Sequence, residues 1–405
     1  MKRYVIVGAS ARCYLMFVTR LVENYHDSVA ITGVYDINKA RCEVFRKKIG
    51  DGCTIYDDFD KMLDAERPDA VIITTIDSVH HEYIICALDK GYDVISEKPL
   101  TNTFERCLAI REAEKRSGRK ITVTFNSRFM PYFYELKKIL VSERIGKPLA
   151  VNYEYCLTRW HGGDYFKRWH RFMENSQGML LHKSTHHFDI VNWLLDDEPV
   201  NVSALANTVY YNDTKKCLGE RCRDCSGKSK CESAMSQTDE LDEILYFNAE
   251  KEDGYIRDNC CFKGDADIYD NMSVSVAYEK GAILTYALNL FSEREGYRIV
   301  ITGEKAVIIA ECWEYGYGTS DKYKIVILDK DYKAETIVFD KSTGSHAGGD
   351  EKLIDMVFGK ENKDVYGQMA DSFSGMVSAI IGIAANESIA SGKTVNVKKY
   401  IDLLR

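Results

Sequence analysis

Short apolar runs alternate with longer amphipathic segments through the first 126 residues. Five runs are rich in β-branched residues, as buried parallel strands are, and the segments between them repeat apolar positions at helical spacing. The predicted strands are RYVIVG (3–8), AITGVYD (30–36), DAVIITT (69–75), YDVISEKP (92–99) and KITVTFN (120–126). The predicted helices are 11–25, 38–49, 79–90 and 103–117. This alternation predicts an α/β domain with a doubly wound parallel sheet.

The pattern changes after residue 126. One helix is predicted at 131–143, strands dominate the rest of the chain, and EKG between two of them predicts a hairpin turn. The predicted strands are 149–157, 200–211, 272–279, 282–291, 297–303 and 322–329. The later helices are predicted at HKSTHHFDIVNWLL (182–195) and near 366–390. We therefore expect a nucleotide-type domain at 1–126 and an α+β domain at 127–405, built on a large, mostly antiparallel open sheet.

Composition narrows the class of protein. The chain has 405 residues, is 45% hydrophobic and 29% charged, and carries a net charge of −8. These values fit a soluble protein of two domains and exclude a basic surface for nucleic acid. No apolar stretch approaches the ~20 residues that span a membrane. Thirteen cysteines are scattered mainly over predicted helices and strands, as free thiols are in a reducing cytoplasm, so we expect a cytoplasmic protein.

The segment GASARC, from Gly8 to Cys13, joins the first predicted strand to the first predicted helix. The Rossmann fingerprint has three glycines at these offsets, and only Gly8 is present. The helix N-terminus behind the turn suits a phosphate, and Arg12 adds a positive charge. Asp36 ends the second strand, where an acid binds a ribose hydroxyl and repels a 2′-phosphate, so the pattern favours NAD over NADP. The alternatives are an ordinary strand-to-helix turn and a helix cap at Asp36.

Titratable residues gather in HKSTHHFD, from 182 to 189. His182, His186 and Asp189 are spaced i, i+4 and i+7, so on one helix they share a face. Two kinds of site fit this arrangement, a zinc site and a proton-transfer site. The ordinary pKa of a histidine side chain is about 6.5, which suits it to accept or release a proton near neutral pH. We favour proton transfer, and satisfied structural histidines are the third alternative.

A second cluster consists of Cys217, Cys222, Cys225 and Cys231 in the spacing C-x4-C-x2-C-x5-C. It lies in a polar insertion at about 212–270 that has no apolar periodicity and cannot build a core of its own. A zinc ion held by four thiolates would supply the missing stability, so we predict one structural zinc per chain. Free thiols, a loop disulfide and an iron–sulfur cluster are the alternatives.

Four segments carry a resemblance to a known family. They are TTIDSVHHEYIICALDKGYDVISEKP, NSRFMP (126–131), GMLLHKSTHHFDIVNWLL and DNMSVSVAYEKGAILTYALN. They resemble the characteristic segments of the Gfo/Idh/MocA oxidoreductases, which act largely on sugars, inositols and related polyols. The resemblance covers nearly the whole chain. It implies an NAD-binding Rossmann domain, an α+β substrate domain and a homodimer or homotetramer.

The resemblance also implies roles for individual residues. Lys98, in Glu97-Lys98-Pro99, matches the lysine beside the nicotinamide, and the bond before this proline is often cis in the family. His186 matches the catalytic histidine, and His182 stands where many members have an aspartate, so Lys98, His182 and His186 are all candidates for the base. The predicted cofactor-binding residues are Gly8, Ser10, Ala11, Arg12, Asp36, Thr75, His80, Glu97, Lys98 and Arg128. The predicted substrate-binding residues are Lys98, Trp160, Arg168, Trp169, His182, Lys183 and His186.

These features predict an NAD-dependent dehydrogenase of the EC 1.1.1 type, which transfers a hydride between a sugar, glycoside or polyol hydroxyl and NAD. One alternative is a glycoside-cleaving enzyme that uses tightly bound NAD in a cycle of oxidation, elimination and reduction. A second alternative is a non-catalytic sugar or NAD sensor, against which the presence of Lys98 and His186 argues. Net accumulation of NADH separates the dehydrogenase from the glycoside-cleaving enzyme.

Overall fold

The computed structural model describes residues 1–235, 240–359 and 363–405. Its first sheet has the strand order β15-β6-β5-β4-β1-β2-β3, and every neighbouring pair is parallel except β15 with β6. The strands are β1 (Lys2–Val7), β2 (Val29–Tyr35), β3 (Thr54–Tyr56), β4 (Ala70–Ile73), β5 (Asp93–Ser96), β6 (Ile121–Val123) and β15 (Ala370–Asp371). The five predicted strands and the parallel sheet are confirmed, whereas β3 and β15 were not predicted.

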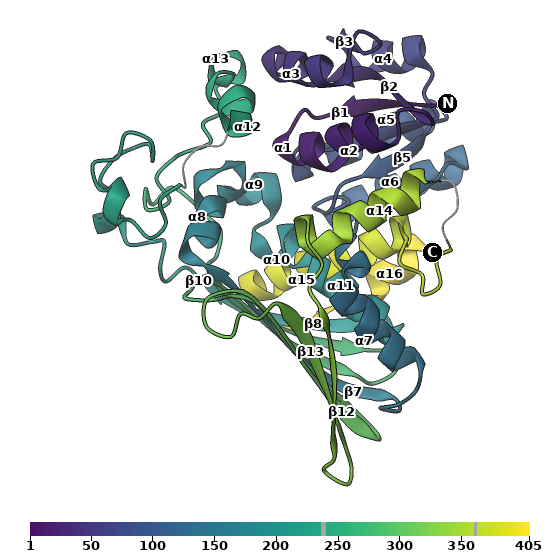
Figure 1. The fold of residues 1–405 in the computed structure, drawn as a ribbon, viewed down its shortest axis with the longest axis vertical. Helices are drawn as coiled ribbons and strands as arrows, with labels where there is room; N and C mark the ends of the chain where they lie inside the picture. Colours follow the sequence, from purple (N-terminus) through teal and green to yellow (C-terminus); the bar gives the residue numbers. More distant parts are fainter. Residues whose placement is uncertain (236–239, 360–362) are drawn as a thin grey trace.

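Helices cover both faces of this sheet (Figure 1). They are α1 (Ala11–Cys13), which continues through η1 (Tyr14–Val18) into α2 (Thr19–Asn24), then α3 (Lys39–Ile49), α4 (Phe59–Glu66), α5 (His80–Asp89) and α6 (Phe104–Ser117). All four residues of β4 are buried as a result, which explains the uninterrupted apolar run in the sequence. Side chains of Asn38, Asp58 and Thr103 accept hydrogen bonds from backbone N–H groups and cap the N-termini of α3, α4 and α6.

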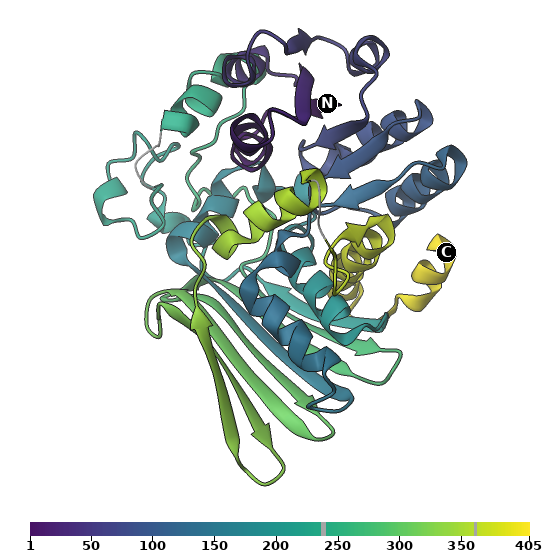
Figure 2. The ribbon, with the colours of Figure 1, turned by 45° about the vertical axis from the view of Figure 1, so that its right-hand side comes forward.

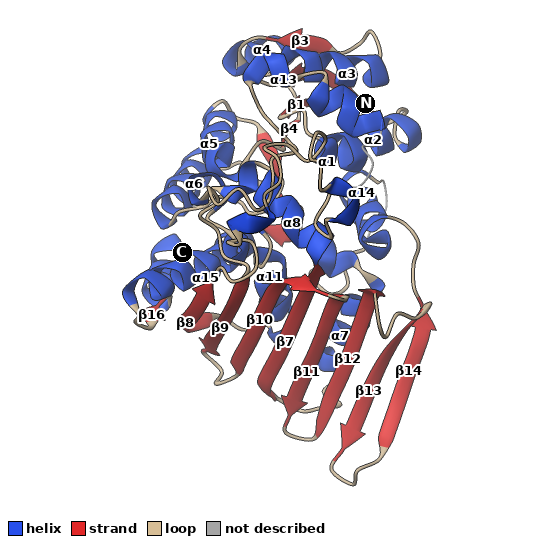
Figure 3. Cartoon of the chain, turned by 90° about the vertical axis from the view of Figure 1, so that its left-hand side faces the viewer, coloured by secondary structure: helices blue, strands red, loops and turns tan. Residues whose placement is uncertain are grey.

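The second sheet has nine strands in the order β14-β13-β12-β11-β7-β10-β9-β8-β16 (Figure 3). Only β10 and β7 pair in parallel, so the predicted, mostly antiparallel sheet is confirmed. The strands are β7 (Pro148–Thr158), β8 (Pro199–Asn207), β9 (Asn271–Tyr278), β10 (Ile283–Ser292), β11 (Glu295–Gly303), β12 (Ala306–Tyr315), β13 (Lys322–Asp329), β14 (Ala334–Asp340) and β16 (Val395–Asn396). Buried and exposed residues alternate along β9 and β10, because helices cover one face.

Helices of the second region cover this face, and two short ones from the same region lie beside α3 of the first domain (Figures 1 and 3). The helices of this region are α7 (Pro131–Val141), α8 (Arg159–Lys167), α9 (Met173–Ser176), α10 (Met179–His182), α11 (Thr185–Leu195), α12 (Glu240–Asp242), α13 (Glu250–Asp253), α14 (Gly349–Phe358), α15 (Ser372–Ser391) and α16 (Lys398–Leu404). By length and hydropathy α15 passes the test for a membrane span, but 61% of its most apolar window is buried. It packs on β8 and α11, as a core helix does.

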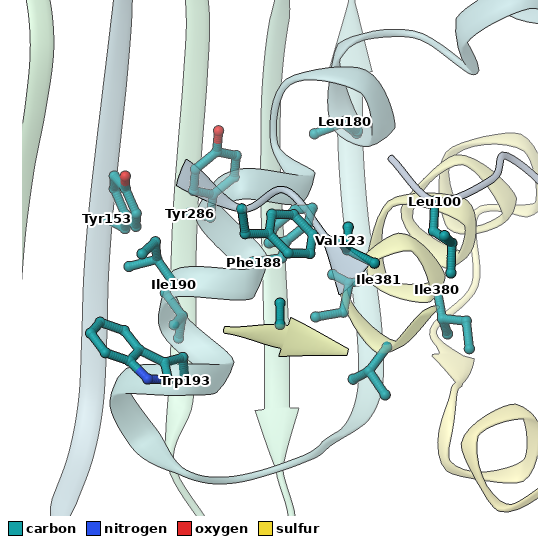
Figure 4. Packing of buried hydrophobic residues seen from close by; sticks show 14 of the residues in the cluster. Leu100, Val123, Tyr153, Leu180, Phe188, Ile190, Trp193, Tyr286, Ile380 and Ile381 are labelled. Atoms are coloured by element: carbon teal, nitrogen blue, oxygen red, sulfur yellow. The ribbon is translucent and has the colours of Figure 1, made fainter. Parts of the chain in front are cut away.

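One apolar cluster crosses from the first domain into the second. Phe188 of α11 packs against the ring of Tyr286 on β10, with 5.2 Å between the ring centroids. Ile381 of α15 belongs to the same cluster, and so do Val123 and Leu100 of the first domain (Figure 4). This shared core fixes α11, and with it the histidine-rich segment, against the first sheet.

Candidate active site

The turn after β1 has the shape that a dinucleotide requires. Gly8 has a φ of +96°, and a Cβ at this position would lie 2.6 Å from the backbone carbon of Thr74 and the backbone nitrogen of Thr75, so only glycine fits. Ser10 caps α1 by accepting a hydrogen bond from the backbone N–H of Cys13 at 3.2 Å. Cys13 is fully buried and packs into the core where the fingerprint has its third glycine. The tight turn and the helix N-terminus therefore fit a pyrophosphate, although two of the three glycines are replaced.

Asp36 follows β2 and lies beside this turn. Its two carboxylate oxygens accept hydrogen bonds from the backbone N–H groups of Ala9 (2.6 Å) and Asn38 (2.7 Å). Burial raises the pKa of Asp36, and the Arg41 guanidinium, 4.0 Å away, opposes that rise. The acid stands where the Rossmann pattern expects the ribose of the cofactor.

Arg12 forms two ion pairs. Its guanidinium contacts the carboxylates of Glu97 at 3.0 Å and Asp350 at 2.8 Å. Burial raises the pKa of Asp350, but His346 and Arg12 more than offset that effect and hold it well below the usual range. Arg12 therefore joins the turn to the segment after β5 and to α14. Asp350 was not predicted from the sequence, because it lies 338 positions from Arg12.

Lys98 lies just beyond the carboxyl end of β5, and the Lys98–Pro99 peptide bond is cis, as the resemblance implied. Its ammonium donates a hydrogen bond to the backbone carbonyl of His182 at 2.9 Å. Burial lowers the pKa of Lys98 to about 8, although the carboxylates of Asp77 and Glu97 favour the charged form. Lys98 is therefore a partly buried amine whose pKa lies below that of a free lysine.

His182 forms a dyad with Asp77. The Nδ1 atom of His182 lies 2.6 Å from Oδ2 of Asp77, which belongs to η2 (Asp77–Val79) after β4. Burial raises the pKa of Asp77 well above its usual value, whereas burial and the Lys98 cation hold the pKa of His182 well below 6.5. If Nδ1–H donates to the carboxylate, Nε2 of the neutral ring is free to accept a proton. Asp77 was not predicted from the sequence. The feature that could have indicated a functional residue is its position just after a predicted parallel strand.

Aromatic side chains surround His182. The centroid of its ring lies 4.3 Å from that of His170, 5.5 Å from that of Trp169 and 5.9 Å from that of Tyr165. His170 is buried, and its Nδ1 has no hydrogen-bond partner in the part of the chain that the structure describes. Burial lowers its pKa well below 6.5, so the ring is neutral. His170 was not predicted, and it is a further candidate to contact the substrate.

Two of the predicted substrate residues lie further out. Trp160 is 44% exposed and stacks on the ring of His161 at 5.3 Å, and His161 in turn stacks on Tyr165. Arg168 pairs with Asp164 at 3.1 Å and lies over the ring of Tyr165. Aromatic rings thus connect the partly buried His182 to the exposed Trp160.

His186 lies on a different helix from His182, which corrects the prediction of one helix over 182–195. α10 ends at His182 and α11 begins at Thr185, so the two rings do not share one continuous helical face. Nδ1 of His186 is 3.5 Å from the Ser127 hydroxyl, and its ring meets that of Phe125 edge-on. Burial and the Lys98 cation hold its pKa well below 6.5. His186 is therefore a further neutral imidazole near Lys98.

The remaining predicted residues of this region have structural partners. Asp189 forms a bidentate ion pair with Arg128, with N–O distances of 2.8 and 2.6 Å. Because Arg128 occupies both carboxylate oxygens, Asp189 does not orient the ring of His186. The two ring nitrogens of His80 lie 2.9 Å from the carbonyl of Pro99 and 3.0 Å from that of Thr75. His80 thus ties together the segments that follow β4 and β5. The ammonium of Lys183 lies over the ring of Tyr155 at 5.5 Å.

The predicted zinc site at Cys217, Cys222, Cys225 and Cys231 is not supported. All thirteen cysteines are free, and within residues 1–235, 240–359 and 363–405 no three His, Cys, Asp or Glu side chains are arranged to hold a metal ion. Ion pairs stabilise this segment instead. Arg221 donates to Asp258 at 2.8 Å and to Glu250 at 2.9 Å. Both partners lie within the insertion, 29 and 37 positions from Arg221 along the chain.

A parallel-sheet domain with a dinucleotide turn is joined to a second domain whose helices α10 and α11 bring His182 and His186 close to Lys98. This arrangement defines a two-domain NAD-binding oxidoreductase. Residues 2–125 match the oxidoreductase family's NAD-binding Rossmann fold, and residues 137–397 match its C-terminal alpha/beta domain. The chain belongs to this family, the Gfo/Idh/MocA oxidoreductases.

Individual relatives agree with this assignment. The chain is 32% identical to YteT of Bacillus subtilis, whose name describes it as an oxidoreductase, over 100% of this chain and 99% of that protein. It is also 32% identical to inositol 2-dehydrogenase 2 of Saccharopolyspora erythraea, over 38% of this chain and 43% of that protein. The structure of the WlbA dehydrogenase of Bordetella pertussis with NADH and UDP-GlcNAcA is similar in fold, with a TM-score of 0.66 and 16% identity over 98% of both chains.

Proposed function

We propose that this oxidoreductase transfers a hydride between a hydroxyl-bearing carbon of a sugar, glycoside or polyol and NAD. The observation that carries the proposal is the convergence of Lys98 with the His182–Asp77 dyad at the carboxyl ends of β4 and β5. In open parallel sheets, cofactors and substrates bind at this edge. The name of the inositol 2-dehydrogenase relative supports a polyol or sugar substrate.

The residues of the first domain fit NAD. The N-terminus of the helix behind the Gly8 turn would face the pyrophosphate, and Asp36 would accept a hydrogen bond from a ribose hydroxyl. When bound, NAD supplies the hydride acceptor. The strand order places β1 between β2, which leads to Asp36, and β4 and β5, which lead to Glu97 and Lys98. A dinucleotide that starts at the turn after β1 would therefore extend toward Lys98.

Oxidation of an alcohol also requires a base, because the hydroxyl loses a proton as its carbon loses a hydride. The charged form of Lys98 would donate a hydrogen bond to the substrate oxygen and stabilise negative charge on it. Nε2 of His182 would accept the proton, since the Asp77 carboxylate stabilises the imidazolium that forms. The Nδ1 atom of His186 lies near the Ser127 hydroxyl and not near a carboxylate that would stabilise an imidazolium. We therefore propose that His186 orients the substrate hydroxyl and does not accept its proton.

A panel of sugars, glycosides and polyols with NAD tests this function. NADH absorbance and the mass of the product are recorded for each compound. Net NADH and a ketone product are expected for a dehydrogenase, whereas cleavage of a glycoside without net NADH would select the redox-neutral cycle. A protein that binds NAD and converts no member of the panel would contradict the proposal. The cytoplasmic location stays a prediction. The homodimer or homotetramer also stays a prediction, and light scattering measures the number of chains in the oligomer.

A further inference from the structure

The insertion between β8 and β9 returns to the nucleotide-binding domain. Its residues 241–257, which we call the strap, include η7 (Glu243–Phe247) and α13, and they lie beside α3 and α1 (Figures 1 and 2). Leu245 is completely buried and belongs to the same apolar cluster as Ile6 of β1 and Phe45 of α3. The strap is therefore packed into the first domain, although it belongs to the second in sequence.

Polar contacts fix the strap to the segment that follows Asp36. Arg41 of α3 donates a hydrogen bond to the carbonyl of Leu245 at 3.0 Å and pairs with Asp253 at 2.8 Å. The amide of Asn38 donates to the carbonyl of Ala249 at 2.9 Å. Both Asn38 and Arg41 are buried in this contact. The strap thus lies over the connection that carries the predicted ribose-binding acid.

Tyr246 reaches the nucleotide turn itself. Its hydroxyl accepts a hydrogen bond from the backbone N–H of Ala11 at 2.9 Å, and Ala11 is the first residue of the helix that a pyrophosphate would meet. Because the hydroxyl acts as acceptor here, its own proton remains available to an anionic oxygen. The Arg257 guanidinium lies 4.4 Å from the centre of the Tyr246 ring, which adds positive charge beside the same point.

We propose that Tyr246 is a cofactor-binding residue which donates a hydrogen bond to the pyrophosphate of NAD, and that the strap covers the turn and slows exchange of the cofactor. This inference rests on the proposed use of NAD. The hydroxyl bridges Ala11 and the phosphate, while Arg41 and Asn38 keep the strap in place. Slow exchange suits the redox-neutral glycoside cycle better than net dehydrogenation, because a net dehydrogenase must release reduced cofactor after every turnover.

The rate at which NADH leaves the full-length protein tests the proposal. NADH is bound first, a large excess of NAD is added, and the loss of energy transfer from tryptophan to NADH is followed by stopped flow. Tyr246→Phe keeps the ring and removes the hydroxyl, so NADH should leave about tenfold faster, the scale of one charge-assisted hydrogen bond. Tyr210→Phe is the matched control, because it removes an insertion hydroxyl that contacts Glu232 and not the turn.

A second readout needs no variant. Hydrogen exchange of the strap in the wild-type protein should slow when NADH is present. Exchange of residues 241–257 that is equally fast with and without NADH overturns the proposal, and so does a Tyr246→Phe variant that releases NADH at the wild-type rate. A wild-type protein that binds no NADH overturns both this proposal and the cofactor assignment. Slow, Tyr246-dependent release without conversion of any sugar or polyol overturns the proposed reaction alone.

Discussion

The nucleotide turn at Gly8–Cys13 and the cluster of Lys98, Asp77 and His182 lie at the same edge of the first sheet, but the chain builds them in different ways. The turn uses backbone N–H groups and one glycine with a positive φ, so serine and cysteine replace the other two glycines without disturbing its shape. The cluster uses titratable side chains: Lys98 and Asp77 change each other's pKa, and Lys98 also lowers the pKa of His182. A backbone site therefore tolerates substitutions, whereas a side-chain site depends on every member.

Removal of the Lys98 side chain should show most clearly that turnover depends on the side-chain cluster and cofactor affinity on the turn. Lys98→Ala takes away the cation that stabilises the substrate oxygen, so turnover should fall by roughly 10²–10⁴. NAD affinity, which depends on the turn, should stay nearly unchanged. Steady-state kinetics and calorimetry measure the two quantities, with Lys90→Ala as a surface control. Near-normal turnover of Lys98→Ala would remove Lys98 from the mechanism.

Substitution of His182 and of His186 should lower turnover by different amounts. His182→Ala should lower turnover by about 10²–10³, since it removes the proposed proton acceptor, and His186→Ala by about tenfold, since it removes an orienting contact. Asp77→Asn should lower turnover and shift the acidic limb of the pH–rate profile, because it changes the partner of the His182 ring. Kinetics over a range of pH tests all three variants. The opposite order of effects would assign the proton to His186.

Burial of four neutral histidines should make folding sensitive to acid. The pKa values of His170, His182, His186 and His187 are all held below 6.5 in the folded state, so the unfolded chain binds more protons below that pH. Stability should therefore decrease as the pH falls, by about 1 kcal/mol per histidine between pH 6.5 and 5.5. Thermal unfolding at several pH values measures this slope. A midpoint that is constant from pH 7 to 5.5 would contradict the burial of these rings.

The smallest expected effect is on cofactor selectivity, and it depends on Asp36 beside the nucleotide turn. The charge of Asp36 should make NAD bind at least about tenfold more tightly than NADP, or about 1.4 kcal/mol. Asp36→Asn removes the charge and should narrow that ratio, with little effect on turnover at saturating NAD. Calorimetry with both cofactors provides the measurement, and Asp27→Asn at the surface is the control. Equal affinities in the wild type would show that Asp36 does not select the cofactor.

The sequence predicted the parts of the molecule that depend on local patterns. The five strands of the first sheet and the position of Asp36 follow from the spacing of apolar runs, whereas the three-residue β3 is too short to give such a pattern. The break between α10 and α11 was missed because the apolar residues on both sides keep helical spacing. The position of Lys98 and His186 in segments that resemble those of the Gfo/Idh/MocA family identified these two residues.

Contacts between distant positions could not be predicted in this way. Asp77 and His182 are separated by 105 positions, and neither residue carries a local signal of the pairing. The ion pairs of Arg221 with Glu250 and Asp258 join positions 29 and 37 apart, which the spacing of the cysteines did not predict. The contact of Tyr246 with Ala11 joins positions 235 apart. Side-chain sites assembled across domains therefore required the structure.

Transfer of deuterium tests the central claim most directly. The substrate that the panel identifies is labelled with deuterium at the carbon that is oxidised, and the cofactor is analysed by mass spectrometry after a single turnover. Hydride transfer at the Lys98–His182 site predicts that one deuterium appears in NADH from the wild-type protein and that its appearance is at least about a hundredfold slower in Lys98→Ala. Formation of an oxidised product with no deuterium in the cofactor would contradict the account.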